Sequence, residues 1–286
     1  KLAAARLRLR ATRSRSNRRG GADFGGTGEG MSSDMDHRAR MAKGLMRGAA
    51  EFLWPQRSLV SGQRGAGKGP LSPSEFAAIG FLSDPVCECC GRPMELDLGP
   101  GAQCAPCIAR PPRWDRARAA LVYEAASRRI VLDLKRSGRR DGLHVMTGWM
   151  HRAGGQLVAE ADLIVPVPLH YTRLVSRGFN QSAWLAQGIA RRAGLSCRVD
   201  VLKRRRRTPT QGGLSAKARR RNVAGAFKVS DRAATHVHDK RILLVDDVLT
   251  TGATLSACTR ALKQAGARQV DVLVLARVVR ETDVTI

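Results

Sequence analysis

Aromatic side chains are scarce in this chain, and acidic side chains are few beside basic ones. Phe, Trp and Tyr make up 4% of the 286 residues, so surfaces that stack nucleobases on aromatic rings are rare. Asp and Glu number 24 against 50 Lys and Arg, which gives a formal charge of +26. This excess favours a polyanionic partner such as nucleic acid or phosphate. An Arg-rich composition is also typical of a GC-rich genome, so charge alone does not decide between the two readings.

Long apolar runs are also missing. No stretch approaches the roughly 18 to 20 unbroken apolar residues of a membrane helix. The first residues contain no apolar segment of the kind that a secretory signal needs. We therefore predict a cytoplasmic protein without a membrane span. Hydrophobic residues still make up 43% of the chain, which is enough for a packed core.

The N-terminal segment differs from the rest in composition. Residues 1–40 are rich in Arg and Gly and have almost no periodic apolar positions, so we expect them to be disordered. One hypothesis is that the natural chain starts at Met31, Met35 or Met41. The alternative is a basic arm that binds nucleic acid.

Four cysteines have the spacing of a metal site. Cys87 and Cys90 form one C-x2-C pair, and Cys104 and Cys107 form a second. Each pair can form a tight turn that directs two thiolates at one point, and two such turns give the tetrahedral sulfur cage that zinc prefers. We predict a structural Zn²⁺ here. Disulfides fit poorly with the predicted cytoplasmic location.

A similar spacing without cysteine comes before this site. Ser58, Ser61, Ser72 and Glu75 repeat the pattern of two close pairs. Serine hydroxyls are poor zinc ligands, so the pattern is interpreted as a degenerate ribbon that holds no metal, with chance similarity as the alternative. Residues 52–112 are predicted to form the zinc-ribbon region, with the second ribbon intact.

The stretch ILLVDDVLTTGAT, residues 242–254, carries the clearest functional signal. Its apolar start predicts a buried parallel strand, the residues after Thr254 have helical spacing, and a second strand is predicted from Val270. The loop between strand and helix therefore lies at the carboxyl end of a parallel strand, where α/β sheets bind ligands.

The residues of this loop suit a ribose 5-phosphate. The carboxylates of Asp246 and Asp247 can accept hydrogen bonds from vicinal hydroxyls, directly or through Mg²⁺. The loop that follows offers hydroxyls, a glycine and backbone N–H groups at a helix N-terminus, which together hold phosphate. A plain helix N-cap would explain one Asp and one Thr, but not the whole run. The candidate phosphate-binding residues are Thr250, Thr251, Gly252, Ala253 and Thr254.

Two further segments contribute candidate anion-binding residues. Pro166, Val167 and Pro168 follow a short apolar strand, and Arg173 and Arg177 follow with helical spacing. Planar guanidinium groups suit phosphate oxygens, although a solvated helix face is the alternative. Residues 203–221 carry nine basic and no acidic residues. This basic loop can close over an anionic ligand or follow the phosphates of a nucleic acid. Its candidate residues are Arg207, Thr208, Gln211, Arg219 and Asn222.

The run VDDVLTTGAT resembles the phosphoribosyl pyrophosphate (PRPP) loop of type I phosphoribosyltransferases. By that resemblance, Asp246 and Asp247 hold the ribose hydroxyls and residues 250–254 hold the 5′-phosphate, with Mg²⁺ as cofactor. The turn at Pro166 to Pro168 contacts the pyrophosphate. One departure is that Thr250 stands where purine-salvage members have an Asp. Thr250 has no carboxylate to serve as a general base near neutral pH, so purine transfer is not expected.

The order of motifs narrows the resemblance further. A cysteine ribbon is followed by PVPL, RGFNQ, T-x-x-Q-x-x-L-S, R-x-x-N and VDDVLTTGAT. This order is similar to that of the ComF family of bacterial competence-related proteins, which join a zinc ribbon to a phosphoribosyltransferase-type domain. The resemblance implies a type I phosphoribosyltransferase-like parallel sheet flanked by helices over residues 115–286, preceded by the ribbon region.

Three functions are compatible with these features. The first is a ComF-type protein that binds PRPP with Mg²⁺, contacts single-stranded DNA and takes part in DNA uptake, with possible partners in the competence machinery. The second is an active transferase that releases pyrophosphate to an unidentified acceptor. The third is a sensor that binds PRPP and regulates a partner without chemistry.

Overall fold

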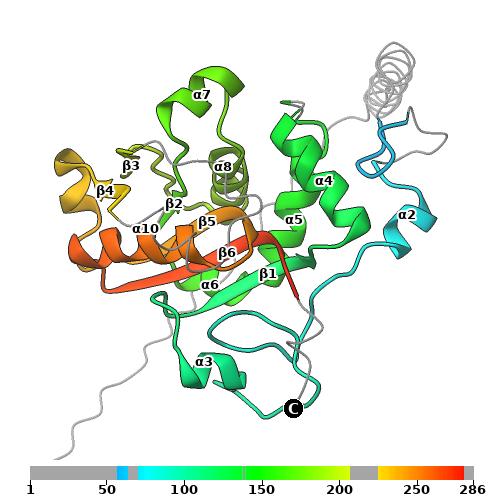
Figure 1. The fold of residues 1–286 in the computed structure, drawn as a ribbon, viewed down its shortest axis with the longest axis horizontal. Coiled ribbons are helices and arrows are strands. Elements are labelled where there is room, and N and C mark those ends of the chain that lie inside the picture. The colour runs from blue at the N-terminus through cyan, green and yellow to red at the C-terminus, as the bar shows by residue number, and fades with distance from the viewer. Residues whose placement is uncertain (1–56, 64–69, 137, 139, 207–224, 280–286) are drawn as a thin grey trace, which may run out of the picture. The chain divides into compact units, whose positions relative to one another are not determined.

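The computed structural model describes residues 57–63, 70–136, 138, 140–206 and 225–279 (Figure 1). Residues 55–286 belong to one compact unit, which includes the cysteine ribbon. The segment predicted to be disordered, residues 1–40, lies outside the described residues, as does most of the basic loop.

A four-stranded parallel sheet forms the centre of this unit. The strands lie in the order β1-β6-β5-β2, and every neighbouring pair is parallel. Their bounds are β1 (Ala117–Val122), β2 (Leu163–Pro166), β5 (Arg241–Leu249) and β6 (Gln269–Arg277). Parallel strands buried on both faces need continuous apolar runs, and β5 and β6 supply them. The predicted strands at residue 242 and at residue 270 are confirmed.

The register aligns apolar side chains across all four strands. Leu244 pairs with Val165 on one side and with Val272 on the other, and Val272 pairs with Ala117. All four belong to the same buried cluster. Alternate residues of the same strands belong to a second cluster on the opposite face, because successive side chains of a strand point to opposite sides.

Helices cover both faces of the sheet (Figure 1). One face packs against α10 (Ala253–Gln264), the small antiparallel pair β3 (Leu202–Arg204) and β4 (Phe227–Val229), and the 3-10 helix η1 (Asp231–His236). The other face packs against α4 (Ala125–Arg136), α5 (Leu143–Ala153), α6 (Gly155–Glu160) and α8 (Gln181–Ala193). The predicted α/β class with a parallel sheet is therefore confirmed.

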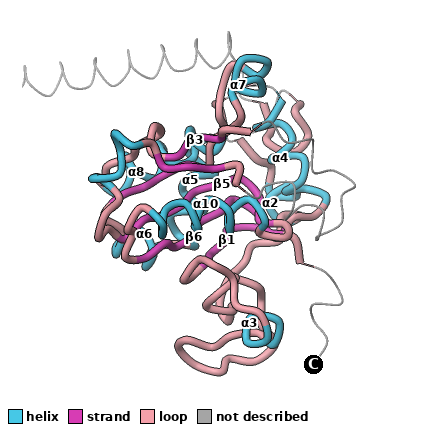
Figure 2. Tube along the Cα trace, turned by 60° about the vertical axis from the view of Figure 1, so that its left-hand side comes forward, coloured by secondary structure: helices cyan, strands magenta, loops and turns pink. Residues whose placement is uncertain are grey.

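Three short helices lie outside these layers. They are α2 (Pro73–Ala77), α3 (Ala105–Ala109) and α7 (Tyr171–Arg177). Figure 2 shows α3 among the loops of the ribbon, apart from the strands. None of the described helices is long and apolar enough to cross a membrane.

The two edges of the sheet differ in how they are closed. At the amino ends of the strands, Arg116 pairs with Asp271 at 2.7 Å and with Glu160 at 2.8 Å, and Arg241 pairs with the same Glu160 carboxylate at 2.5 Å. These ion pairs close that edge. The carboxyl ends of β2 and β5 lie at the opposite edge and are free to form a site.

Candidate functional site

The acidic pair lies in the second half of β5, so the strand extends further than its apolar run. Asp246 Oδ1 accepts hydrogen bonds from Ser182 Oγ at 2.8 Å and from the backbone N–H of Asp247 at 2.9 Å. Asp247 Oδ2 accepts a hydrogen bond from Gln181 Nε2 at 2.8 Å, and Asp247 Oδ1 lies 3.3 Å from Lys135 Nζ. The first turn of α8 therefore holds both carboxylates, and α4 supplies a cation.

The two carboxylates differ in environment. Asp247 is 5% exposed, whereas Asp246 is half-buried. Burial, together with the charge of the neighbouring Asp247, raises the pKa of Asp246 to about 7, against the lowering effect of the Ser182 hydrogen bond. Asp246 is therefore poised to lose its proton when a cation binds beside it.

The loop after β5 begins exposed and ends in a helix. Thr250 is exposed, and Gly252 caps α10 with φ of +71°. A Cβ at Gly252 would lie 2.4 Å from Cη2 of Trp114, so this position excludes any larger residue. The leading N–H groups of α10 have no acceptors within the helix and point to where an anion would bind.

These residues line one cavity of about 420 Å³ at the carboxyl edge of the sheet. The structure brings together most of the predicted ligand-binding residues there. Those that line the cavity are Val167, Pro168, Arg173, Arg177, Asp246, Asp247, Thr250, Gly252, Ala253 and Thr254.

Two predicted residues lie elsewhere. Pro166 is the last residue of β2 and does not line the cavity. Thr251 lines a neighbouring, larger cavity instead. Successive side chains in a tight loop point in different directions. The sequence pattern therefore could not show which cavity each Thr side chain lines.

Five further residues with polar or charged side chains line the cavity, and the sequence pattern had not singled them out as ligand-binding. They are Tyr123, Lys135, Gln181, Ser182 and Arg204. Gln181 and Ser182 follow Asn180, whose side chain caps α8 by accepting from the Ser182 N–H at 3.1 Å. That capping pattern was a usable signal for where the helix begins. Arg204 belongs to the basic run of residues 203–221, whereas Lys135 carried no such signal, because its position depends on how α4 packs.

Arg204 adds to the positive charge of the site. Burial, and secondly the nearby Arg173, lowers the pKa of Arg204. Guanidinium groups gathered in this way favour a bound anion. Arg204 also ends β3, from which the basic loop departs. The loop residues Arg207, Thr208, Gln211, Arg219 and Asn222 lie outside the described residues.

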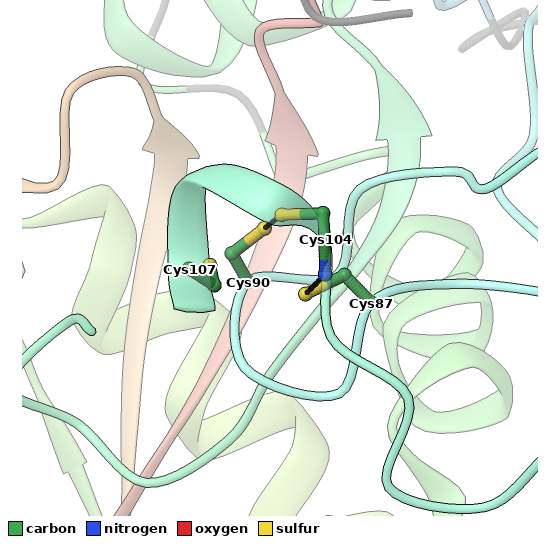
Figure 3. Close-up of side chains that lie close together, drawn as sticks. All are labelled: Cys87, Cys90, Cys104 and Cys107. Carbon is green, nitrogen blue, oxygen red and sulfur yellow. Dashed lines mark hydrogen bonds between the residues drawn. The ribbon is translucent and has the colours of Figure 1, made fainter. Parts of the chain in front are cut away.

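The four predicted zinc ligands converge (Figure 3). The sulfur atoms of Cys87, Cys90, Cys104 and Cys107 all lie within 4.8 Å of one another, and Cys90 Sγ is 3.8 Å from Cys104 Sγ. A tetrahedral site with zinc–sulfur bonds of about 2.3 Å has sulfur–sulfur edges of about 3.8 Å. The cluster therefore fits a metal such as zinc, and no pair of these cysteines forms a disulfide.

The cysteine turn is joined directly to β6 and, through Trp114, to the loop after β5. Trp114 Nε1 donates a hydrogen bond to the carbonyl of Cys89 at 2.7 Å, and Arg277, the last residue of β6, donates to the carbonyl of Cys90. Trp114 is the same residue that packs against Gly252. The ribbon and the loop after β5 thus share a buried contact.

The degenerate ribbon also converges, around a carboxylate. Glu75 Oε1 accepts hydrogen bonds from Ser58 Oγ at 2.5 Å and from the Ser61 N–H at 3.2 Å, and Glu75 Oε2 accepts from the Ser72 N–H at 2.9 Å. These bonds, that of Ser58 above all, lower the pKa of Glu75 to about 2. Hydrogen bonds to Glu75 therefore hold the residues that occupy the ligand positions of the ribbon pattern.

Cys197 and Cys258 lie apart from the four-cysteine cluster. Burial raises the pKa of Cys197 to about 11 and raises that of Cys258 well above its ordinary value. Such thiols are poor nucleophiles.

Comparisons with known proteins give consistent results. The family profile described as a phosphoribosyl transferase domain matches residues 180–284. Competence protein F of Haemophilus influenzae is 29% identical over 208 residues, covering 68% of this chain and 86% of the relative. DNA utilization protein YhgH of Escherichia coli K12 is 33% identical over 199 residues, covering 67% of this chain and 84% of the relative.

Two further matches are more partial. Competence protein ComFC of Streptococcus pneumoniae is 32% identical over 113 residues, covering 40% of this chain and 47% of the relative. The solved structure of the allosteric regulatory enzyme of purine biosynthesis is 22% identical, with a TM-score of 0.34, and covers 50% of this chain and 30% of that chain.

Proposed function

This chain belongs to the ComF/YhgH family of competence and DNA utilization proteins, and from that premise we propose that it binds PRPP with Mg²⁺ during DNA uptake and natural transformation. The observation that carries the proposal is a single cavity that joins Asp246 and Asp247 to the start of α10. It places acceptors for ribose hydroxyls beside donors for a phosphate.

Each part of PRPP has a matching group in the cavity. Asp246 and Asp247 would accept the ribose hydroxyls, and the N–H groups of residues 250–254 would hold the 5′-phosphate. Arg173 and Arg177 would pair with the pyrophosphate oxygens. Asp246 and Asp247 are the residues that could hold Mg²⁺, which would supply positive charge to offset the charge of the pyrophosphate.

Calorimetric titration of Mg-PRPP tests this proposal. Wild-type protein should bind, and Asp246→Asn/Asp247→Asn should lose about 2 kcal/mol or more, because charged hydrogen-bond acceptors are removed. Equal affinity in the two proteins would reject the assignment of the acidic pair. If neither protein binds Mg-PRPP, the fold has retained the sequence of this loop without retaining PRPP binding.

A second candidate is catalysis, which the arginines on the pyrophosphate side of the cavity favour. Attack of an acceptor nucleophile on C1 would form the new bond while the bond from C1 to pyrophosphate breaks. Arg173 and Arg177 would stabilise the charge on the departing pyrophosphate. Since Thr250 cannot act as a general base, the acceptor must be deprotonated by another group or already be anionic.

Release of pyrophosphate from PRPP in the presence of fractionated cell metabolites distinguishes these candidates. Turnover that disappears in Asp246→Asn/Asp247→Asn would establish a transferase. Binding without turnover would favour a sensor, for which the contact between Gly252 and Trp114 offers a route from ligand to ribbon.

A place in DNA uptake is tested genetically. We propose a cytoplasmic protein that acts with the competence machinery and contacts single-stranded DNA. Expression in a Haemophilus influenzae strain that lacks its competence protein F should restore transformation. Failure of the wild-type protein, when it is expressed and folded, would count against a shared role.

A further inference from the structure

A second and larger cavity lies between the cysteine ribbon and α10. Its volume is about 1150 Å³. We call it the ribbon–helix cleft. Six of its lining residues are basic and, among the described residues that line it, none is acidic. The basic residues are Arg92, Arg110, Arg113, Arg260, Lys263 and Arg277.

The rim of the cleft carries exposed charge. Arg110 and Arg113 follow α3 on the ribbon side, and Arg260 lies on the outer face of α10. All three are exposed, so their guanidinium groups can meet a ligand without displacing a core contact. Lys263 is less available to a ligand, because its Nζ forms an ion pair with a carboxylate oxygen of Asp115 at 2.8 Å.

The buried part of the lining contains polar atoms that lack protein partners. Thr259 Oγ1, Thr251 Oγ1 and Arg277 Nε are buried and have no hydrogen-bond partner within the described part of the chain. Thr259 is 0% exposed and Arg277 is 5% exposed. Leaving a buried donor unsatisfied costs roughly 1–3 kcal/mol. These atoms have almost no accessible surface, so the exposed cations of the rim are the groups that a ligand in the cleft can contact.

The length of the cleft indicates more than one phosphate. Its α10 side runs from Ala253 to Gln264, which spans about 16 Å at the rise of an α-helix. Cations on both sides of such a length suit a row of phosphates. A single phosphate group would use only one end of it.

We propose that the ribbon–helix cleft binds single-stranded DNA through its phosphate backbone, an inference that rests on the proposed role in DNA uptake. The rim arginines would contact successive phosphates of a strand that enters between the ribbon and α10. A rigid duplex presents its phosphates on a wide cylinder and could reach only the rim. Few aromatic rings are available, so recognition would be electrostatic and sequence-tolerant.

The cleft adjoins the proposed PRPP site. Thr250 and Ala253 line both cavities. A strand in the cleft would therefore lie beside the loop that holds the 5′-phosphate. The described residues that line this cleft differ from those of the basic loop, residues 203–221. In the sequence, charge had pointed to that loop as the place of DNA contact.

The test measures fluorescence anisotropy of a labelled oligothymidylate. The variant Arg110→Ala/Arg113→Ala/Arg260→Ala removes the rim charge. The matched control Arg128→Ala/Arg129→Ala/Arg152→Ala removes three exposed arginines on α4 and α5, on the opposite face of the sheet. Both variants lose the same net charge, so a difference between them reports on the place of the charge.

The cleft variant should bind at least tenfold more weakly than wild type near physiological salt, and the control should bind within about twofold of wild type. The slope of log affinity against log salt should fall by about 2 in the cleft variant, at about 0.7 for each phosphate that the variant no longer neutralises.

Several results would overturn the proposal. Equal losses of affinity in the two arginine variants would show a diffuse charge effect. Competition by poly-glutamate or by duplex DNA as strong as that by the single strand would reject single-stranded DNA as the occupant. Titration of Mg-PRPP into the same wild-type protein reports separately on the phosphoribosyl site. The two proposals can therefore fail independently.

Discussion

Asp246 and Asp247 are neighbours in β5, but removing the charge of each should change the stability of the folded protein in opposite directions. The folded protein holds Asp246 at a pKa of about 7, above the roughly 3.9 of an unfolded chain, so the fold favours the neutral carboxyl. Its contribution to stability is present below about pH 4 and is lost as the pH rises to about 7. Asp246 therefore weakens the ligand-free fold at alkaline pH.

The first prediction follows from the raised pKa of Asp246. Asp246→Asn should raise the free energy of unfolding of the ligand-free protein at pH 8 by about 1 kcal/mol, and the gain should shrink towards pH 4. The amide keeps the Oδ1 that accepts from Ser182 and from the Asp247 N–H. Urea denaturation at both pH values measures the difference.

Asp247→Asn is the neighbouring control. It removes the ion pair with Lys135 in a buried position, so stability at pH 8 should fall by about 1–2 kcal/mol. An Asp246→Asn protein that is less stable than wild type at pH 8 would contradict the raised pKa.

The second prediction concerns Glu75 in the degenerate ribbon. Its pKa is lowered to about 2, so its hydrogen bonds contribute stability above about pH 4.5 that is lost as the pH falls towards 2. Glu75→Gln should remove about 1 kcal/mol at neutral pH, a modest value because the group is partly solvated. The exposed Glu95→Gln is the matched control. The free energy of unfolding is measured against pH for both proteins. If it falls in the same way towards acid pH in wild type and in Glu75→Gln, the hydrogen bonds of Glu75 contribute nothing to stability.

At the scale of elements, the join between β5 and α10 depends on one glycine. The third prediction is that Gly252→Ala destabilises the protein by about 2–4 kcal/mol, from positive φ and from collision with Trp114. Gly194→Ala is the control, because Gly194 has φ of +67° and nothing within 4 Å of an added Cβ. It should cost only about 1–2 kcal/mol. Thermal denaturation of the two variants separates strain from collision, and equal losses of stability would refute the Trp114 contact.

Local pattern was sufficient for some elements and not for others. The strand from residue 242, helix α10 and the strand from residue 270 follow from apolar periodicity, because parallel strands and amphipathic helices impose it. The pair β3 and β4 has too few residues for a periodic signal. Likewise, Lys135 reaches Asp247 only because α4 packs on the same sheet as β5, which no local pattern records.

The candidate site shows the same limit. Spacing alone predicted that the four cysteines converge and that most of the candidate ligand-binding residues share one cavity, since adjacent positions on a loop share one location. Spacing could not assign Thr251 to the ribbon–helix cleft, nor foresee that Arg277 holds the ribbon. Those facts depend on long-range packing between the ribbon and β6.

At the scale of the whole unit, buried contacts of Trp114 join the cysteine cluster to the loop after β5. The fourth prediction is that a zinc-selective chelator, with Mg²⁺ in excess, lowers both the urea midpoint and the affinity for Mg-PRPP. The carbonyls of Cys89 and Cys90 anchor Trp114 and Arg277, and they lose their fixed positions when the thiolates are released. Denaturation and calorimetry before and after zinc is restored measure the effect. Unchanged PRPP affinity in the zinc-free protein would show that the ribbon is independent of the loop.

The position of Trp114 has an optical consequence. Its indole is buried, donates to the ribbon backbone and touches Gly252 at the start of α10. Indole emission depends on the polarity and rigidity of the surroundings. The protein therefore carries a native fluorophore where the cysteine ribbon meets the loop after β5, and the proposed binding of metal or PRPP can be tested by its emission without attaching a dye.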